Sequence, residues 1–174
     1  MLSRLAYRAR QFWNALLSPQ RWVETRAISP PLTSAQVILF RRMQPSEQVH
    51  AYQVFQHLKA VGHTDSDLLV AALLHDVGKI LYPLSIFDRV VIVLGKRLFP
   101  RAAQRWSGGT PRGLRRPFVV AVNHAAWGAD LAAQAGASSR TVELIRCHQD
   151  SPAPETGSRT ERLLAALHAA DDES

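Results

Sequence analysis

The sequence predicts an all-α fold, a helical bundle with a basic amphipathic helix at its N-terminus. Three observations support this: apolar residues recur at spacings of three and four, residues that favour helix starts precede these segments, and Gly or Pro separates them. Hydrophobic residues make up 47% of the 174 residues and charged residues 20%, as is typical of a folded chain. We expect an N-terminal segment at residues 1–30 and one domain at residues 31–174.

The N-terminal segment combines helical periodicity with a basic bias. Between residues 1 and 26, five arginines stand against one acid, Glu24, and apolar residues lie three or four positions apart. One interpretation, which we favour, is a helix that packs on the rest of the domain. The other is a helix that lies on an anionic membrane surface. A Ser-Pro-Pro turn at residues 29–31 separates this segment from the domain.

The first part of the domain contains three expected helices. Ser34 can cap the first of these, and Ser46 can begin the second, which ends at Gly62. Asp65 can open the third, which is strongly apolar and finishes in the sequence Leu-His-Asp-Val-Gly-Lys at residues 74–79. The glycine of that sequence, Gly78, is expected to help the chain turn.

The middle of the domain contains a basic insertion. Residues 86–94 resemble a strand by composition, but their position between helical segments and the lack of a pairing strand favour a helix. The stretch of residues 89–116 has eight basic residues and no acidic one, with a Gly-rich sequence near its centre. The basic residues are Arg89, Lys96, Arg97, Arg101, Arg105, Arg112, Arg115 and Arg116.

Three more helices are expected after Pro117. Their periodic segments lie around residues 124–134, 139–148 and 160–171. Gly136 separates the first two, and a loop rich in Pro and Ser at residues 151–158 separates the last two.

The charge and the cysteine count restrict partners and chemistry. A net charge of +7 and a pI near 10.5 favour anionic partners such as phosphorylated metabolites, nucleic acid or a membrane surface. The single cysteine, Cys147, excludes an intramolecular disulfide and a Cys-rich zinc site, so a bound metal needs His and carboxylate ligands. No apolar run is long enough for a transmembrane helix, and Arg8 and Arg10 interrupt any secretory signal. We expect a cytoplasmic protein, with peripheral membrane contact as a second option.

The strongest local signal is the pair His75-Asp76 at the end of the apolar helix. A buried ionised aspartate needs a compensating charge, and a divalent metal supplies one. Imidazole nitrogen and carboxylate oxygen are both good ligands, and a carboxylate can bridge two ions. The alternative is a helix-terminal aspartate beside a surface histidine, but the apolar run before the pair argues against it. Histidines on other expected helices can converge on the pair, as they do in metal sites of helical bundles.

These residues give the chain a resemblance to the HD-domain superfamily of metal-dependent phosphohydrolases. The superfamily pattern is a histidine on one helix, the His-Asp pair and a later aspartate, and it is matched over about residues 46–172 by His50, His75, Asp76 and Asp171. Asp172 competes with Asp171, which is preferred because it fits the family's Ala-Asp ending. The resemblance implies a helical HD fold and a metal-dependent hydrolase.

Two further histidines, His124 and His148, are similar to those of two-metal HD subgroups, in particular the hydrolases that split diadenosine tetraphosphate symmetrically. The resemblance implies a first ion bound by His50, His75, Asp76 and Asp171. It also implies that Asp76 bridges to a second ion bound by His124 and His148. The expected cofactors are two divalent ions, with iron or manganese preferred.

The expected catalytic residues are Asp76 and Lys79. Lys79 lies one helical turn beyond His75, where it can reach a substrate phosphate. A solvated lysine at a helix end is an equally good interpretation. Near His148, Asp150 can orient an imidazole, but an exposed loop acid is the favoured interpretation. Three histidines are expected at the surface or at helix ends: His57, His63 and His168.

Three functions are compatible with these residues. The leading hypothesis is a phosphohydrolase that acts on a nucleotide or another small phosphate ester. The second is an oxygenase, because some HD-domain proteins with a similar ligand set hold mixed-valent di-iron. The third is a metal-stabilised module that binds an anionic membrane or nucleic acid, although no specific nucleic-acid motif is present. Cyclic di-GMP is disfavoured as a substrate, because Gln-Asp-Ser-Pro at residues 149–152 replaces the Gly-Tyr-Pro signature of its hydrolases.

Overall fold

The computed structural model describes residues 31–150 and 157–174, together with Val23 and Ile28. Within these residues every regular element is a helix and no strand is present, so the predicted all-α fold is confirmed. The predicted N-terminal amphipathic helix lies outside the described residues, apart from Val23 and Ile28, which are buried in the core. No described helix is long and apolar enough to cross a membrane.

The first two described helices start one residue away from their predicted starts. Helix α3 (Ser34–Arg41) is capped by Thr33, not Ser34, because Thr33 forms a capping box with Gln36 three positions later. Helix α4 (Pro45–Ala60) begins at Pro45, one residue before Ser46, since the ring of a proline suits the first helical position. Gly62, just beyond α4, has a φ of 91° and ends the helix as predicted.

Helix α5 (Ser66–Leu74) lies at the centre of the molecule. Asp65 caps it as predicted by accepting hydrogen bonds from the backbone N–H groups of Asp67 and Leu68. Six of its nine residues are buried, as in a helix that is surrounded on all sides. It packs against α4, α9 (Ser139–Cys147) and α10 (Arg159–Glu173). The His-Asp pair that follows α5 is therefore placed in the interior.

A 3₁₀ helix, η1 (Val77–Leu81), follows the pair and packs against α8 (Arg116–Gln134). Gly78 is required here for a different reason from the predicted one. A Cβ at this position would lie 2.0 Å from the carbonyl oxygen of His124 and 2.7 Å from the backbone nitrogen of Gly128. Gly78 thus permits close packing of η1 on α8, whereas its φ is not positive.

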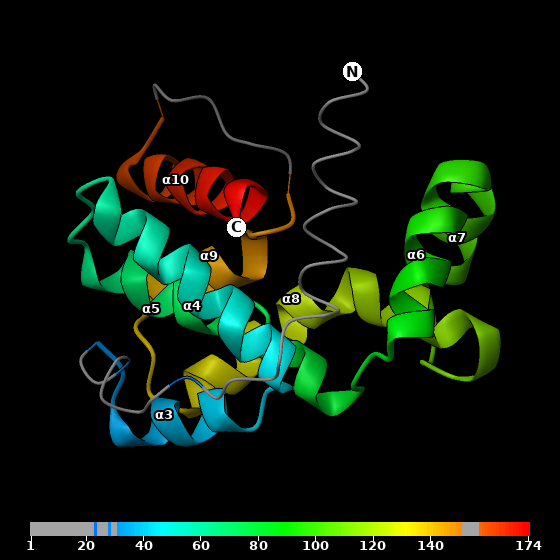
Figure 1. Cartoon of the computed structure of the whole chain (residues 1–174), viewed down its shortest axis with the longest axis horizontal. Coiled ribbons are helices and arrows are strands. Elements are labelled where there is room, and N and C mark those ends of the chain that lie inside the picture. Colours follow the sequence, from blue (N-terminus) through cyan, green and yellow to red (C-terminus); the bar gives the residue numbers. More distant parts are fainter. Residues whose placement is uncertain (1–22, 24–27, 29–30, 151–156) are drawn as a thin grey trace.

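The predicted basic insertion forms a helical hairpin. Residues 86–94 belong to helix α6 (Ile86–Leu98), which confirms the helix that the sequence favoured, and α7 (Pro100–Trp106) follows directly. The two helices pack on each other and on α8, with the short helix η2 (Gly113–Arg115) leading into α8. Figure 1 shows this α6–α7 hairpin at one end of the molecule, apart from α4, α5, α9 and α10.

The last three α-helices agree with the predicted segments, except that α8 begins earlier. It starts at Arg116, and Pro117 occupies its first turn instead of preceding it, where a proline costs no hydrogen bond. Ser138 caps α9, and Ser158 caps α10 in a capping box with Glu161. Helix α8 packs on α9 and runs from the bundle to the hairpin, so its length connects the two parts of the fold (Figure 1).

Candidate metal centre

The structure brings the six predicted ligand residues together from five places in the chain. His50 lies on α4, His75 and Asp76 join α5 to η1, His124 lies on α8, His148 follows α9, and Asp171 lies on α10. The side chains form two groups of three, and the ligand atoms of each group lie within 4.8 Å of one another. The first group is His50, His75 and Asp171, and the second is Asp76, His124 and His148.

The first group links the two outer helices to the central one. His50 Nε2 lies 2.8 Å from Asp171 Oδ1, and His75 Nε2 lies 3.5 Å from the same oxygen. The rings of His50 and His75 meet edge to face, with centroids 5.4 Å apart. All three ligand atoms therefore point to one space.

The second group gathers around one oxygen of Asp76. Asp76 Oδ1 lies 3.2 Å from His124 Nε2 and 4.0 Å from His148 Nε2. Its other oxygen, Oδ2, lies 3.7 Å from His75 Nε2 in the first group. Asp76 is thus the residue that faces both groups.

Backbone carbonyls fix the orientation of three of the histidine rings. The Nδ1 atoms of His75, His124 and His148 lie 2.9, 3.0 and 2.7 Å from the carbonyl oxygens of Ala72, Val120 and Ile145. A carbonyl only accepts, so each Nδ1 carries a proton and donates it, and each Nε2 is the ring nitrogen that faces the centre. This is the arrangement that orients metal-binding histidines in proteins.

The buried Nε2 of His75 provides a test of whether a metal fits. This atom has no hydrogen-bond partner among the described residues, although its carboxylate neighbours lie within 4 Å. A buried ring nitrogen without a partner is costly unless something binds it. A divalent cation between these histidines and carboxylates would bind it, so the residues present fit a metal.

Most of the centre is buried, but one side of it is exposed to solvent. Four of its side chains, those of His75, Asp76, His124 and His148, are at most 6% exposed, whereas those of His50 and Asp171 are 30% and 37% exposed. Solvent and small molecules therefore reach the centre from the side of His50 and Asp171.

The charges of the site favour ionised carboxylates and a neutral inner histidine. Burial alone would raise the pKa of Asp76, but Lys79, His75 and His124 hold it well below its ordinary value. Burial also opposes ionisation of Asp171, yet the hydrogen bond from His50 and the charge of His75 lower its pKa. Burial and His75 lower the pKa of His148 to about 3, so this imidazole is neutral near pH 7.

His50 differs from His148 because it pairs with an acid. Burial lowers its pKa, but the hydrogen bond to Asp171 and the charge of Asp76 outweigh burial and raise it above the ordinary value. The more open side of the centre thus contains a stabilised His50–Asp171 pair.

Lys79 is neither solvated nor free. Its Nζ lies 2.6 Å from Asp76 Oδ2 and 3.4 Å from Glu47 Oε2, and its side chain is 21% exposed. Burial would lower its pKa, but Asp76 and Glu47 raise it well above the ordinary lysine value, so Lys79 stays charged. Whether it also contacts a substrate phosphate remains a prediction.

Glu47 is the residue of the site that the sequence analysis missed. It is buried, and its Oε1 lies 2.5 Å from Arg89 Nη2 while its Oε2 faces Lys79. Its spacing of three from His50 places both on one face of α4, and this spacing is the signal that could have revealed it. Through Glu47, the α6–α7 hairpin is connected to the centre.

The other candidates lie outside the two groups. Asp172 is exposed, Asp150 is an exposed acid after α9, and the carbonyl of Ile145, not Asp150, orients His148. His57 lies 3.5 Å from Glu173, and His57 and His63 are half-buried. His168 departs from its predicted surface position: the residue is half-buried, and both of its ring nitrogens are buried without a partner among the described residues.

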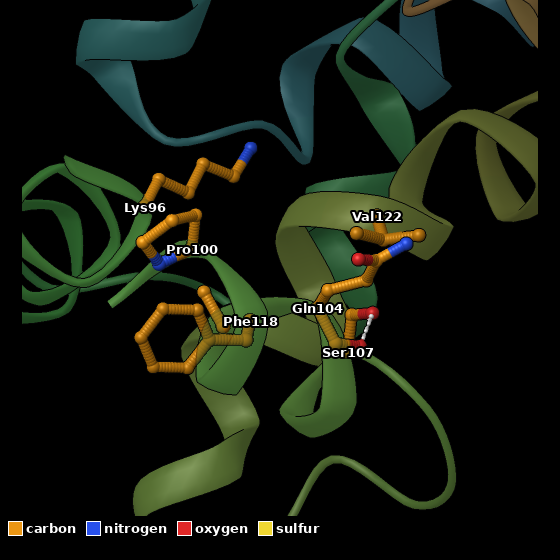
Figure 2. A pocket seen from close by; sticks show the side chains of 7 residues that line it. Lys96, Pro100, Gln104, Ser107, Phe118 and Val122 are labelled. Atoms are coloured by element: carbon orange, nitrogen blue, oxygen red, sulfur yellow. Dashed lines mark hydrogen bonds between the residues drawn. The ribbon is translucent and has the colours of Figure 1, made fainter. Parts of the chain in front are cut away.

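A separate hollow of about 230 Å³ lies between the hairpin and α8. Figure 2 shows it lined by Lys96, Pro100, Gln104, Ser107, Phe118 and Val122. None of the six candidate ligands lines it, so it is not part of the metal centre.

Comparison with protein-family models matches residues 48–174 to the HD domain. The match spans more than half of the chain and includes all six residues of the two groups. The chain belongs to the HD-domain family. Comparisons with curated proteins and with solved structures gave no match.

HD domains are generally metal-dependent hydrolases, so membership supports a divalent metal site and an enzyme in coarse terms. The match is to the HD domain as a whole. The closer resemblance to the diadenosine tetraphosphate hydrolases is not supported by it and stays a prediction.

Proposed function

We propose that this HD domain is a phosphohydrolase that acts on a nucleotide or another small phosphate ester through two divalent ions, iron or manganese. The observation that carries the proposal is the division of six ligands into two groups of three, each with its ligand atoms within 4.8 Å. With Asp76 shared, four protein ligands on the first ion and three on the second would leave positions for water and substrate on six-coordinate metal ions.

The orientation of Asp76 supports two ions in preference to one. Its Oδ1 faces His124 and His148, and its Oδ2 faces His75. A carboxylate with its two oxygens directed to two ligand groups is suited to bridge two cations. In this proposal the first ion takes His50, His75, Asp76 and Asp171, and the second takes Asp76, His124 and His148.

Divalent ions bound there would lower the pKa of a water molecule and offset the negative charge of phosphoryl oxygens. The chain's own residues hold the ligands in place and keep them in the right protonation state. The carbonyls of Ala72, Val120 and Ile145 hold the protons of three imidazoles at Nδ1. Lys79 keeps Asp76 ionised and supplies a fixed positive charge beside it.

The surroundings of the centre favour an anionic substrate. Two cations, Lys79 and Arg89, lie beside it with 21% and 30% of their side chains exposed. Phosphate oxygens bind such cations well, since a charged hydrogen bond is stronger than a neutral one. We propose that Lys79 contacts a substrate phosphate, and that dinucleoside polyphosphates are among the first compounds to test.

The test is a hydrolysis assay of the full chain with manganese or iron against nucleotides, dinucleoside polyphosphates and simple phosphate esters. We expect metal-dependent release of phosphate or of a nucleotide, abolished in His124→Ala and retained in the control His63→Ala, which lies outside both groups. Protein that contains metal yet is inactive across the panel would refute the proposal.

The same assay separates the hydrolase from the oxygenase. Full turnover with manganese under anaerobic conditions excludes an oxygenase. Substrate-dependent oxygen uptake by the iron form, without phosphate release, would replace the hydrolase proposal with that alternative.

A further inference from the structure

The outward face of α6 is apolar and, among the residues that the structure describes, largely exposed. None of its thirteen residues is buried. Four apolar side chains at positions i, i+4, i+7 and i+11 form one line along the helix, which is called here the α6 stripe. They are Phe87, Val91, Leu94 and Leu98, with exposed fractions of 82%, 45%, 49% and 60%.

The opposite face of α6 is fixed to the rest of the molecule, so the stripe is held outward. Gly95 rests on the ring of Phe118, where a Cβ would lie 2.5 Å from Cζ. Arg89 pairs with the buried Glu47 on α4, and Asp88 lies 3.4 Å from Arg116 of α8. The attachment of α6 is therefore defined, and the exposure of the stripe is not a result of a loose helix.

Exposed positive charge is concentrated in the same part of the chain as the stripe. Asp88 is the only acid in the sequence between Asp76 and Asp130, and it forms an ion pair with Arg116. Six cations of the basic insertion are exposed, on α6, on α7 and on the loop and short helix after it. They are Lys96, Arg97, Arg101, Arg105, Arg112 and Arg115. The same region exposes Phe99 (65%) and Leu114 (89%).

We propose that the α6–α7 hairpin docks on the surface of an anionic phospholipid bilayer, with the α6 stripe among the acyl chains and exposed cations of the hairpin, such as Arg97 beside Leu98, on the headgroups. An occupant of this face must offer apolar surface and negative charge together, and an anionic bilayer offers both. Basic amphipathic helices with Phe and Leu on the apolar face bind membranes in this way. The proposal is independent of the reaction at the metal centre.

Other occupants fit the face less well. A second copy of the chain would bring the exposed cations of its hairpin close to those of the first, and like charges repel. The segment of residues 1–26 has five arginines against one acid, so its net charge has the same sign as that of the hairpin. Nucleic acid has the charge, but it has no apolar surface for Val91, Leu94 and Leu98, because bases stack on aromatic side chains instead.

The test is flotation of the full chain with vesicles of phosphatidylglycerol and phosphatidylcholine, compared with vesicles of phosphatidylcholine alone. We expect binding to the anionic vesicles only, decreasing as salt is raised. Phe87→Ser/Leu98→Ser is expected to lower the partition coefficient about tenfold or more. The matched control is Ile38→Ser/Val61→Ser, at two exposed apolar residues on α3 and at the end of α4, and it should bind as the native chain does.

A second pair of variants tests the charge. Arg97→Glu/Arg101→Glu is expected to weaken binding by roughly tenfold or more, because each cation near an anionic bilayer contributes to attraction. Arg42→Glu/Lys59→Glu makes the same change in net charge at two exposed residues, one directly after α3 and one on α4, and it should have a small effect. Unchanged melting temperatures would show that the variants fold.

Four results would overturn the proposal. The first is no binding to anionic vesicles, and the second is binding that the stripe variant leaves unchanged. The third is a dimer, by light scattering, that becomes a monomer in the stripe variant, which would assign the face to a second copy. The fourth is binding to an oligonucleotide that the charge variant weakens, with no binding to vesicles.

Discussion

His50 Nε2 lies 2.8 Å from Asp171 Oδ1, although 121 residues separate them in the sequence. This contact joins α4 to α10 at the open side of the metal centre, and it completes the first group of ligands only when the last helix has packed. The metal centre and the fold of the C-terminal helix therefore depend on each other.

The first prediction concerns the choice of the last ligand. Asp171→Asn removes the charge that faces His50 and His75, and we expect the affinity for divalent metal to fall by at least about tenfold. The matched control is the exposed neighbour, Asp172→Asn, which should leave affinity unchanged. Calorimetric titration with manganese measures both. Equal losses in the two variants would show that Asp171 has no special role.

Lys79 provides the second prediction. Lys79→Met leaves the buried carboxylates of Asp76 and Glu47 with one cation fewer, and we expect kcat/KM for a hydrolysed phosphate ester to fall about a hundredfold. Lys79→Arg keeps the charge and should retain part of the activity. Lys59→Met changes an exposed lysine on α4 and serves as the control. Native kinetics in Lys79→Met would remove Lys79 from the catalytic residues.

The third prediction follows from the contact between η1 and α8. In Gly78→Ala the new methyl group would overlap the carbonyl oxygen of His124, so η1 must separate from α8 and His124 must move. We expect a loss of about 3 kcal/mol or more in the free energy of unfolding. Gly108→Ala, where a Cβ meets no atom within 4 Å, should change it by less than about 0.5 kcal/mol. Urea unfolding measures the two, and similar values would contradict the packing argument.

The fourth prediction concerns the cap of α5. Asp65 accepts two backbone hydrogen bonds and lies 2.7 Å from Arg159 Nη2, so Asp65→Ala should cost about 1 to 2 kcal/mol near neutral pH. Asp65→Asn keeps the cap without the charge and should cost less.

The dependence of this effect on pH has a definite sign. Burial would raise the pKa of Asp65, but Arg159 and the N–H of Leu68 lower it below its ordinary value of 3.8. The stabilisation that depends on the negative charge of Asp65 is therefore complete above pH 3.8. It is lost as the pH falls through the lower pKa of Asp65 in the folded protein. The difference between native protein and Asp65→Ala should shrink in acid, and a difference that grows there would contradict this assignment.

Local patterns predicted much of the fold. Apolar periodicity located the helices, and Asp65 and Gly62 marked the limits of α5 and α4, because caps and positive φ angles are properties of a few adjacent residues. The starts of α3 and α4 differed by one residue from the prediction, because Thr33 and not Ser34 makes the capping hydrogen bonds of α3 and because Pro45 takes the first position of α4. Gly78 was noticed, but its true reason, the proximity of His124, is a tertiary contact.

The part of the candidate site that rests on local patterns was predictable, and the part that rests on tertiary contacts was not. The His-Asp pair after a buried helix indicated a metal, and the resemblance supplied the distant partners. Glu47 and Arg89 were missed as a pair because 42 residues separate them and only the packing of α6 on the domain brings them together. The burial of both ring nitrogens of His168 is likewise a tertiary effect that the residues next to it in the sequence do not reveal.

The most direct test of the account is the metal content of the full chain purified without chelator, measured by inductively coupled plasma mass spectrometry. Asp76 faces both ligand groups, so the account predicts about two divalent ions per chain in the native protein and loss of most of this metal in Asp76→Asn. His63→Asn, outside both groups, should retain the native content. Native protein without metal, or an equal content in Asp76→Asn, would contradict the central claim.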